Sequence, residues 1–525
     1  MKLCSALIAA LTCSFLLAAC TGESSTDEAD QAAPLTPTLI DVSSPTSVVD
    51  GASPTDIALS ASQAFFSQAP VVVVADAADA AVQEQAATLA GDVGAPLLLA
   101  ASPASEPAPS ATATTPAPES SSVADGVVSR VVGEIERLGA TTVVTYGPTA
   151  VDVTEALGDG VSSIAASAGA TPSDMELPAT EPATPTASVL ALATPASGVA
   201  AEATARAAGA EVRRVPGPDP RTDSELIQAL ASSKPERVVA LGSEFGPADQ
   251  LAARVSVAAT GVELPGGGQV LYPYHRHVAL YGNPTTGALG SLGEQPLPEA
   301  ITRVKQLAAQ YQQLTDATVV PTFEIITTVA SAVPDEDGNY STESALSDIR
   351  PYIDAAAQAG VYVVLDLQPG RADFLTQAQL YEEFLKQPHV GLALDPEWRL
   401  GPNQVHLRQI GTVTAAEINS VATWLADLTR ANNLPQKLLL LHQFKSTMIS
   451  DRTTVDTSRD ELAVLIHVDG FGPPGAKFAT WNVLREDPPQ NVWWGWKNFI
   501  DEDSPTFTPA QTLAINPVPH FVSYQ

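Results

Sequence analysis

The carboxyl-terminal half of the chain repeats a short apolar run followed by a longer helix-like stretch, and this repetition limits the possible folds most. Eight apolar runs occur there: His277–Tyr281, Thr318–Ile325, Val361–Leu367, Val390–Leu394, Lys437–Phe444, Leu462–Val468, Phe478–Val483 and Val492–Phe499. Helix-like stretches separate most of them, among them Glu299–Leu314, Ser344–Ala359, Ala372–Lys386 and Ala415–Asn432. Eight alternations in about 250 residues predict a (β/α)8 barrel of the TIM type over residues 270–525, with a doubly wound open sheet as the alternative.

The preceding part of the chain, residues 56–265, shows the same alternation in a shorter form. Apolar runs at Val71–Val74, Pro96–Leu99 and Thr142–Thr145 alternate with helix-like stretches at Ala78–Val93 and Val127–Leu138. A second unit has strand-like runs at Val189–Ala193, Glu211–Val215 and Arg237–Leu241, with helix-like stretches at Ala200–Ala208 and Ser224–Ala231. This order predicts an α/β repeat domain with parallel sheets. Two Pro-, Ala-, Ser- and Thr-rich stretches, 101–122 and 171–187, are expected to be irregular loops.

This duplicated domain resembles the type 2 cell-wall-binding repeat of bacterial surface proteins. The resemblance rests on Gly94-Ala95-Pro96-Leu97-Leu98-Leu99, on the run Leu138–Gly147, and on Val238-Val239-Ala240-Leu241-Gly242 in the second unit. The family has three units and a Gly-Gly pair after the strand, whereas this chain has two units with Gly147-Pro148 and Gly242-Ser243. The resemblance implies a partner in cell-envelope polysaccharide or peptidoglycan. A plain α/β spacer domain is the alternative.

The amino terminus carries the features of an export signal. One basic residue, Lys2, precedes an apolar run from Leu3 to Leu17, which ends in Leu17-Ala18-Ala19-Cys20. These features predict a signal peptide over residues 1–19. The last four residues resemble the lipobox of bacterial lipoproteins, which implies cleavage before Cys20, lipidation of its thiol, and anchoring to the outer face of the cytoplasmic membrane at the cell wall. An ordinary signal peptide is the alternative. Residues 20–55 are expected to be a flexible linker.

Composition excludes several classes of function. The chain has 26 Lys and Arg against 59 Asp and Glu, a net charge of −33, which disfavours nucleic acid as a partner. Its three cysteines are Cys4, Cys13 and Cys20, so the predicted mature body has no thiol for a disulfide, a nucleophile or a zinc–cysteine site.

Polar side chains follow nearly every predicted strand of the barrel. The candidates are Glu324, Asp366, Asp395, Glu397, Trp398, His442, Gln443, His467, Asp469, Trp481, Trp496 and Lys497. Because the active site of such a barrel lies at the carboxyl ends of its strands, we expect these side chains to converge at one mouth.

Carbohydrate hydrolysis is the first interpretation, because glycosidic cleavage needs two carboxyl groups and aromatic faces. Asp395-Pro396-Glu397-Trp398 resembles the acid/base strand of retaining (β/α)8 glycosidases. This resemblance implies that Glu397 is the general acid/base. Asp469 or Asp366 is the candidate nucleophile or stabiliser, and the other candidates are expected to bind or orient substrate. Those enzymes place the nucleophile after strand seven, where this chain offers Asn482.

Two further interpretations stay open. His442, His467 and Asp501, with His275 and His277, suggest a metal-dependent amidohydrolase-like barrel, but the last two residues stand at the start of strand one, the wrong end. This interpretation ranks lower, and we expect neither a metal nor another cofactor. The third interpretation is a non-catalytic module that holds a saccharide or a peptide at the same mouth.

Overall fold

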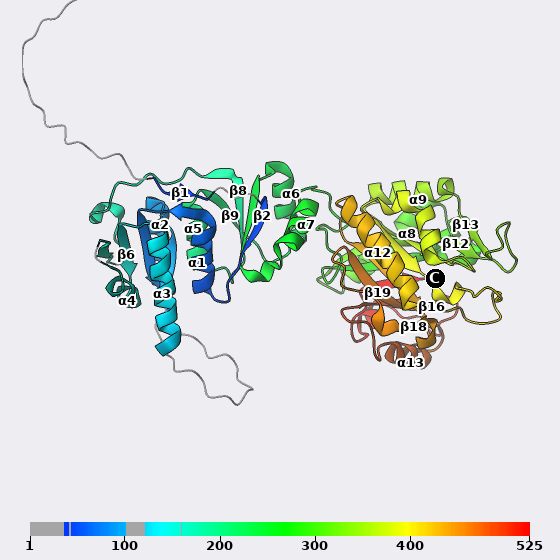
Figure 1. Ribbon diagram of the computed structural model, residues 1–525. Helices are drawn as coiled ribbons and strands as arrows, with labels where there is room; N and C mark the ends of the chain where they lie inside the picture. Colours follow the sequence, from blue (N-terminus) through cyan, green and yellow to red (C-terminus); the bar gives the residue numbers. More distant parts are fainter. Residues whose placement is uncertain (1–35, 41–43, 101–120, 159, 168) are drawn as a thin grey trace, which may run out of the picture.

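The computed structural model describes residues 36–40, 44–100 and 121–525, apart from residues 159 and 168. These residues form two lobes, an amino-terminal α/β lobe and a carboxyl-terminal barrel (Figure 1). The predicted signal peptide, Cys20 and most of the stretch 101–122 lie outside the described residues. Among the helices that the structure describes, none combines the length and the apolar character needed to cross a membrane.

The first sheet of the amino-terminal lobe has four parallel strands in the order β5-β4-β6-β7. Its elements are β4 (Val71–Asp76), α2 (Ala80–Val93), β5 (Leu97–Ala100), α3 (Ser121–Arg137), β6 (Thr142–Tyr146), α4 (Thr149–Glu155) and β7 (Ser162–Ala165). Strand β4 is buried along its whole length, as its run of valines requires of a central parallel strand. Helix α2 begins where the Asp79 carboxylate accepts backbone hydrogen bonds and ends at Gly94, whose φ of 65° permits a left-handed cap.

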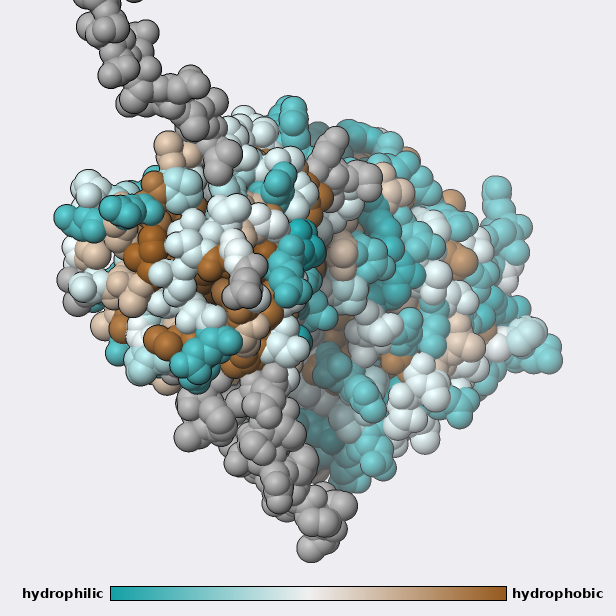
Figure 2. All heavy atoms as spheres, turned by 60° about the vertical axis from the view of Figure 1, so that its left-hand side comes forward, coloured by the Kyte–Doolittle hydropathy of each residue, from teal (hydrophilic) through white to brown (hydrophobic). Residues whose placement is uncertain are grey.

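The second sheet also has four parallel strands, in the order β2-β10-β8-β9. Its elements are β2 (Thr46–Val49), α1 (Pro54–Phe65), β8 (Thr186–Ala193), α5 (Val199–Ala207), β9 (Ala210–Arg214), α6 (Ser224–Ser233), β10 (Arg237–Leu241) and α7 (Ala248–Ala258), with a small antiparallel pair, β1 (Thr38–Leu39) and β3 (Phe66–Gln68). The space-filling view in Figure 2 brings this lobe forward and shows fewer strongly hydrophilic side chains on it than on the barrel behind.

One sequence expectation for this lobe needs correction, and a second is largely met. The flexible linker predicted over residues 20–55 does not extend to residue 55, because β2 lies within it and pairs with β10 through main-chain hydrogen bonds. The buried Val49 at the end of β2 shows why this segment joins the fold. The stretch 171–187, expected to be a loop, is largely irregular before β8 begins at Thr186, and its Met175 and Leu177 pack against the core of the first sheet.

The carboxyl-terminal lobe is a closed barrel of eight parallel strands. In chain order these are β11 (His275–Gly282), β12 (Thr318–Ala330), β14 (Tyr362–Leu367), β15 (Val390–Leu394), β17 (Lys437–Gln443), β19 (Leu462–Val468), β20 (Trp493–Asn498) and β21 (Phe521–Tyr524). Strand β11 pairs with β12 on one side and with β21 on the other, which closes the barrel. The helices are α8 (Leu297–Gln312), α9 (Leu346–Ala359), α10 (Phe374–Leu380), α11 (Glu382–Leu385), α12 (Ala415–Ala431), α13 (Pro474–Leu484) and α14 (Pro509–Leu513). The predicted (β/α)8 barrel is therefore confirmed.

The identity of the last two barrel strands differs from the prediction. The run Phe478–Val483 lies in helix α13, with Lys477, Trp481 and Leu484 buried at the three-to-four-residue spacing of a helix. The predicted eighth strand is therefore the seventh, β20. The eighth is β21, a four-residue strand at the carboxyl terminus that the sequence analysis missed.

The barrel interior changes from apolar to charged along its axis. Its amino-terminal part is a core of apolar side chains, including Tyr272, Ala279, Val320, Tyr362, Val364, Ala393, Leu438, Leu440, Ala463, Leu465 and Phe521. The side chains that point inward beyond this core include acids, histidines, Tyr281 and Lys497. The apolar core stabilises the barrel, and the polar side chains that could form a site lie at the carboxyl ends of its strands.

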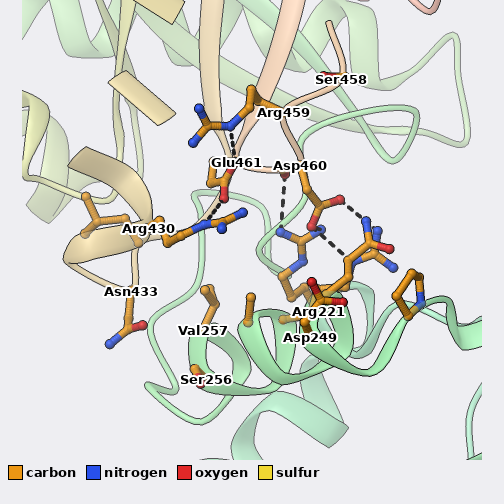
Figure 3. Close-up of a pocket in the computed structure, with 15 residues that line it drawn as sticks. Arg221, Asp249, Ser256, Val257, Arg430, Asn433, Ser458, Arg459, Asp460 and Glu461 are labelled. Carbon is orange, nitrogen blue, oxygen red and sulfur yellow. Dashed lines mark hydrogen bonds and ion pairs between the residues drawn. The ribbon is translucent and has the colours of Figure 1, made fainter. Parts of the chain in front are cut away.

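The two lobes meet at the amino-terminal side of the barrel. Figure 3 shows the junction, where Arg221 and Arg254 of the first lobe both pair with Asp460 of the barrel, at 2.8 and 2.7 Å. A cavity of about 470 Å³ lies beside these ion pairs. The chain crosses here through the turn Gly266-Gly267-Gly268, and Leu264 and Leu271 on either side of it pack into the apolar barrel core.

Candidate active site

Glu397 reaches the mouth of the barrel because the chain turns directly after β15. Asp395 follows the strand, and its Oδ1 accepts a hydrogen bond from the backbone N–H of Glu397 at 3.3 Å, which caps the single turn Pro396–Trp398. This turn places Glu397 and Trp398 in a cavity of about 380 Å³. Cavities of this size hold small ligands or single units of a polymer.

The cavity combines acids with aromatic and aliphatic walls. Its lining residues are Tyr281, Ala288, Leu289, Ile326, Val329, Ala330, Gln368, Asp395, Glu397, Trp398, Phe444, Asp469, Phe471, Lys497, Phe499, Glu502 and Gln525. They come from the ends of several barrel strands and from the loops that follow, as expected for the functional face of this fold.

His442 lies in the barrel interior next to this cavity, with carboxyl groups on both sides of its ring. Its Nδ1 is hydrogen-bonded to Asp469 Oδ2 at 3.1 Å. Its Nε2 lies 2.9 Å from Glu324 Oε1 and 3.7 Å from Asp366 Oδ1. The side chains of His442, Glu324 and Asp366 are completely buried. The imidazole therefore links the carboxyl groups of three different strands and loops.

Tyr281 and Lys497 close the set from the first and seventh strands. The Tyr281 hydroxyl donates a hydrogen bond to Asp366 Oδ2 at 3.0 Å and accepts one from Gln368 Nε2 at 3.3 Å. Lys497 Nζ lies 3.6 Å from the centre of the Tyr281 ring, within cation–π range. Burial and the neighbouring carboxylates raise the pKa of Tyr281 well above its usual value, so its hydroxyl stays a donor.

Burial shifts the acids of this site toward their protonated forms. Burial, followed by the charge of Asp469, raises the pKa of Glu397 to about 7. Burial also raises the pKa of Asp366 to about 6, and burial with the charge of Glu397 raises the pKa of Asp395 well above its usual value. A carboxylic acid that keeps its proton near neutral pH can donate it to a leaving group.

The two central partners are shifted in the opposite sense, toward their charged forms. Burial lowers the pKa of His442, but Asp366, Glu324 and Asp469 outweigh it and raise that pKa well above the usual value. Burial raises the pKa of Asp469, but the hydrogen bond and charge of His442 and the charge of Lys497 bring it below the usual value. Both shifts favour a charged imidazole beside a charged carboxylate at this contact.

The structure brings most of the predicted site residues together. Five of them, Asp395, Glu397, Trp398, Asp469 and Lys497, line the cavity, and Gln368, which was not predicted, lines it with them. Glu324, Asp366 and His442 form the adjacent buried cluster. His467 belongs to the same interior: its ring centre lies 5.2 Å from that of His442, and its Nε2 lies 2.7 Å from Ser523 Oγ.

Three predicted residues lie elsewhere. Trp481 and Trp496 are buried outside the barrel wall, between α13 and β20, where their rings pack against each other and against Phe507. Gln443 faces outward and bonds the backbone of Lys445 and the side chain of Arg452. The prediction that these side chains contact substrate is corrected: they hold the wall and a loop in place.

The sequence analysis also missed residues of the cavity. Tyr281 ends the first strand, Gln525 follows the unpredicted β21, and Phe471 and Phe499 lie in loops after the sixth and seventh strands. Tyr281 could have been found, because its alternation with Ala279 places it on the inner face of β11.

Possible metal ligands are distributed unevenly over the barrel. His275 and His277 lie at the amino-terminal end of β11, where His277 packs on Tyr272, Tyr362 and Phe521. They therefore stand away from the mouth, as their position at the start of the strand predicts. Glu324, His442 and His467 instead offer ligand atoms that all lie within 4.8 Å of one another.

Comparison of the chain with protein-family models and with the curated proteins gives no match.

Proposed function

We propose that the barrel mouth is the active site of a hydrolase that cleaves a glycosidic bond in cell-envelope carbohydrate, with Glu397 as the general acid. One observation carries the proposal: a carboxyl group with a pKa of about 7 projects into a cavity that also holds a second carboxyl group and several aromatic rings. That combination is what glycosidic cleavage requires.

Glu397 suits the role of acid because its environment disfavours the carboxylate. Burial and the charge of Asp469 favour its protonated form, and that proton passes to the glycosidic oxygen as the bond to the sugar breaks. The backbone N–H of Glu397 is fixed by Asp395, so the carboxyl group is carried on a restrained turn.

Asp469 is the better partner of the two acids considered from sequence. It lines the same cavity as Glu397, whereas Asp366 is completely buried and bonded to Tyr281. Asp469 Oδ2 is held by His442 Nδ1, while its Oδ1 has no hydrogen-bond partner among the described residues. Oδ1 is buried next to the cavity that Asp469 lines, and a bound sugar or the attacking water would supply its missing partner.

Rings around the two acids supply apolar surfaces for a sugar. Trp398, Phe444, Phe471 and Phe499 line the cavity, and Lys497 and Gln368 add donors for hydroxyl groups. Sugars present a flat apolar face with a polar edge, which such a lining complements.

The location of the substrate belongs to the same proposal. A lipid anchor at Cys20 would hold the chain at the outer face of the cytoplasmic membrane, and the repeat-like first lobe would bind wall polysaccharide or peptidoglycan. Growth with a labelled fatty acid tests the anchor, because the label enters the parent chain and not the Cys20→Ala variant.

The decisive experiment separates turnover from binding. The parent protein, Glu397→Gln and the control Glu299→Gln, on the exposed face of α8, are assayed for release of reducing ends from purified wall glycan and for glycan binding by pull-down. We expect Glu397→Gln to lose about 100-fold or more of the turnover and to keep binding, with the control unchanged. Binding without turnover in the parent would leave the non-catalytic saccharide module as the function.

A further inference from the structure

The barrel interior holds a group of polar atoms that the protein leaves without hydrogen bonds. Among the described residues, the buried side-chain atoms without a partner include Glu324 Oε1 and Oε2, Asp366 Oδ1, His442 Nε2, His467 Nδ1 and Asp469 Oδ1. Buried polar atoms nearly always have partners, because an unpaired one has lost its hydration without a replacement. Several such atoms from adjoining strands indicate a common ligand that satisfies them together.

Glu324 is the clearest member of this group. Its side chain is completely buried, and neither carboxylate oxygen has a hydrogen bond. Its Oε1 is 2.9 Å from His442 Nε2, but the two atoms do not have the alignment of a hydrogen bond. A proton on Nε2 therefore does not point at that oxygen, and the close approach fits two ligands of one ion better than a donor with its acceptor.

Each histidine of the group is held by a second partner. Asp469 Oδ2 accepts from His442 Nδ1, which leaves Nε2 toward Glu324. Ser523 Oγ bonds His467 Nε2, and the bare backbone of Gly495 makes room for this ring, since a Cβ there would lie 2.4 Å from His467 Nδ1. Carboxylate or hydroxyl groups that orient a histidine from behind are the usual outer partners of metal-binding imidazoles.

We propose that Glu324, His442 and His467 bind one divalent transition-metal ion, with Zn²⁺ as the best match. Their ligand atoms lie within 4.8 Å of one another, the separation expected around a single ion. Two imidazoles with a carboxylate select a transition metal over Mg²⁺ or Ca²⁺, which prefer oxygen ligands. Asp366 Oδ1, 3.7 Å from His442 Nε2, is the nearest additional oxygen.

Carboxyl oxygens surround the proposed site. Glu324, Asp366 and Asp469 place carboxyl oxygens around the His442 ring, and Lys497 lines the adjoining cavity together with Asp395 and Asp469. Buried charges persist in proteins when they are paired or coordinate a metal. This inference is independent of the proposed hydrolysis by Glu397, and it differs from the expectation of a metal-free barrel.

Metal binding is measured on the purified full chain after treatment with a chelator and dialysis. ZnCl2 is added in a calorimetric titration, and CoCl2 is added in a second sample to record its visible spectrum. We expect one ion per chain and intense Co²⁺ bands in the visible. Glu324→Gln and His467→Gln, which each remove one ligand, should weaken Zn²⁺ binding more than tenfold. His520→Gln, at the other end of the barrel, should leave it unchanged.

The outcomes separate the alternatives. Absence of stoichiometric Zn²⁺ binding by the parent, or equal affinity in Glu324→Gln, overturns the site and leaves His442 as an imidazolium among carboxylates. If circular dichroism shows that Glu324→Gln does not fold, the Co²⁺ spectrum of the parent protein decides. A parent spectrum without strong visible bands overturns the proposed site. Glu397→Gln should retain the ion, so that loss of glycan turnover and loss of metal are distinguishable.

Discussion

His277 near the amino-terminal end of the barrel and His442 near its mouth are both shielded from solvent, yet their neighbours are of opposite kinds. His277 packs against Tyr272, Tyr362 and Phe521, and burial lowers its pKa well below the usual value. His442 stands among three carboxyl groups, which raise its pKa well above the usual value despite equal burial. Burial alone therefore does not make a functional histidine; the charges around the ring decide.

The same contrast extends to the other charged side chains of the two ends. Near the amino-terminal end, Lys437 is completely buried and donates to two backbone oxygens, those of Gln387 and Val390, both at 2.8 Å. At the mouth, carboxyl groups outnumber cations. The amino-terminal end of the barrel therefore holds an isolated cation in an apolar wall, whereas the mouth has several carboxyl groups next to a cavity.

The largest expected difference between the two ends is the stability lost when His442 or His277 is replaced. His442→Gln leaves Glu324, Asp366 and Asp469 without their common partner and should reduce the free energy of unfolding by about 3–5 kcal/mol. His277→Gln loses ring packing and the 3.2 Å contact of Nδ1 with the Tyr272 hydroxyl, a cost of about 1–2 kcal/mol. Urea unfolding at pH 7 measures both values.

A double variant tests whether charge causes that difference. Glu324→Gln combined with His442→Gln removes a negative charge together with the positive one, so it should be more stable than His442→Gln alone. Equal losses for the two histidine variants, or no recovery in the double variant, would show that the two ends differ in packing and not in electrostatics.

The sequence alone was sufficient to predict the barrel and the position of its acids, because both depend on local patterns of residues. Strands β12, β14, β15 and β19 begin as apolar runs that lead to an acid within the strand or just after it, so Glu324, Asp366, Glu397 and Asp469 could be placed at one end of a parallel barrel before any coordinates. Strand β21 has only four residues, and its pairing with β11 is a long-range contact without a local pattern.

Which face of the wall a side chain occupies was harder to predict. Along β20, Gly495 and Lys497 face inward, so the intervening Trp496 must face outward, where it packs on Trp481. The tryptophans of this segment suggested an aromatic surface for a sugar. Adjacent side chains of one strand point to opposite faces, however, so Trp496 and Lys497 cannot line the same site. The buried contacts of His442 also depend on strands far apart in the sequence, which no local pattern reveals.

Lys437 gives a smaller effect that depends on pH. Burial lowers its pKa from 10.5 to about 7, so between these values the folded state binds fewer protons than the unfolded state. The parent protein should therefore lose stability as the pH falls from 9 to 7, by roughly 2 kcal/mol relative to Lys437→Met. Urea titrations at the two pH values measure the difference. Lys305→Met, on the exposed side of α8, should change nothing, and a parent curve parallel to that of Lys437→Met would contradict the lowered pKa.

The smallest expected effect is a shift in the pH dependence of kcat/KM when a charged residue at the barrel mouth is replaced. As the acid, Glu397 must be protonated, so kcat/KM on wall glycan should fall as the pH rises through about 7.

The charged groups that act on Glu397 are Asp469, Lys497, His442, Asp366 and Asp395. Lys497 favours the carboxylate and so lowers the pKa of Glu397, which means that Lys497→Met should move the alkaline limb to higher pH even if the maximum rate decreases. Lys445→Met, in the exposed loop after β17, should leave the limb in place. A limb that stays fixed or moves to lower pH in Lys497→Met would mean that another group titrates, and Glu397 would lose its assignment as the acid.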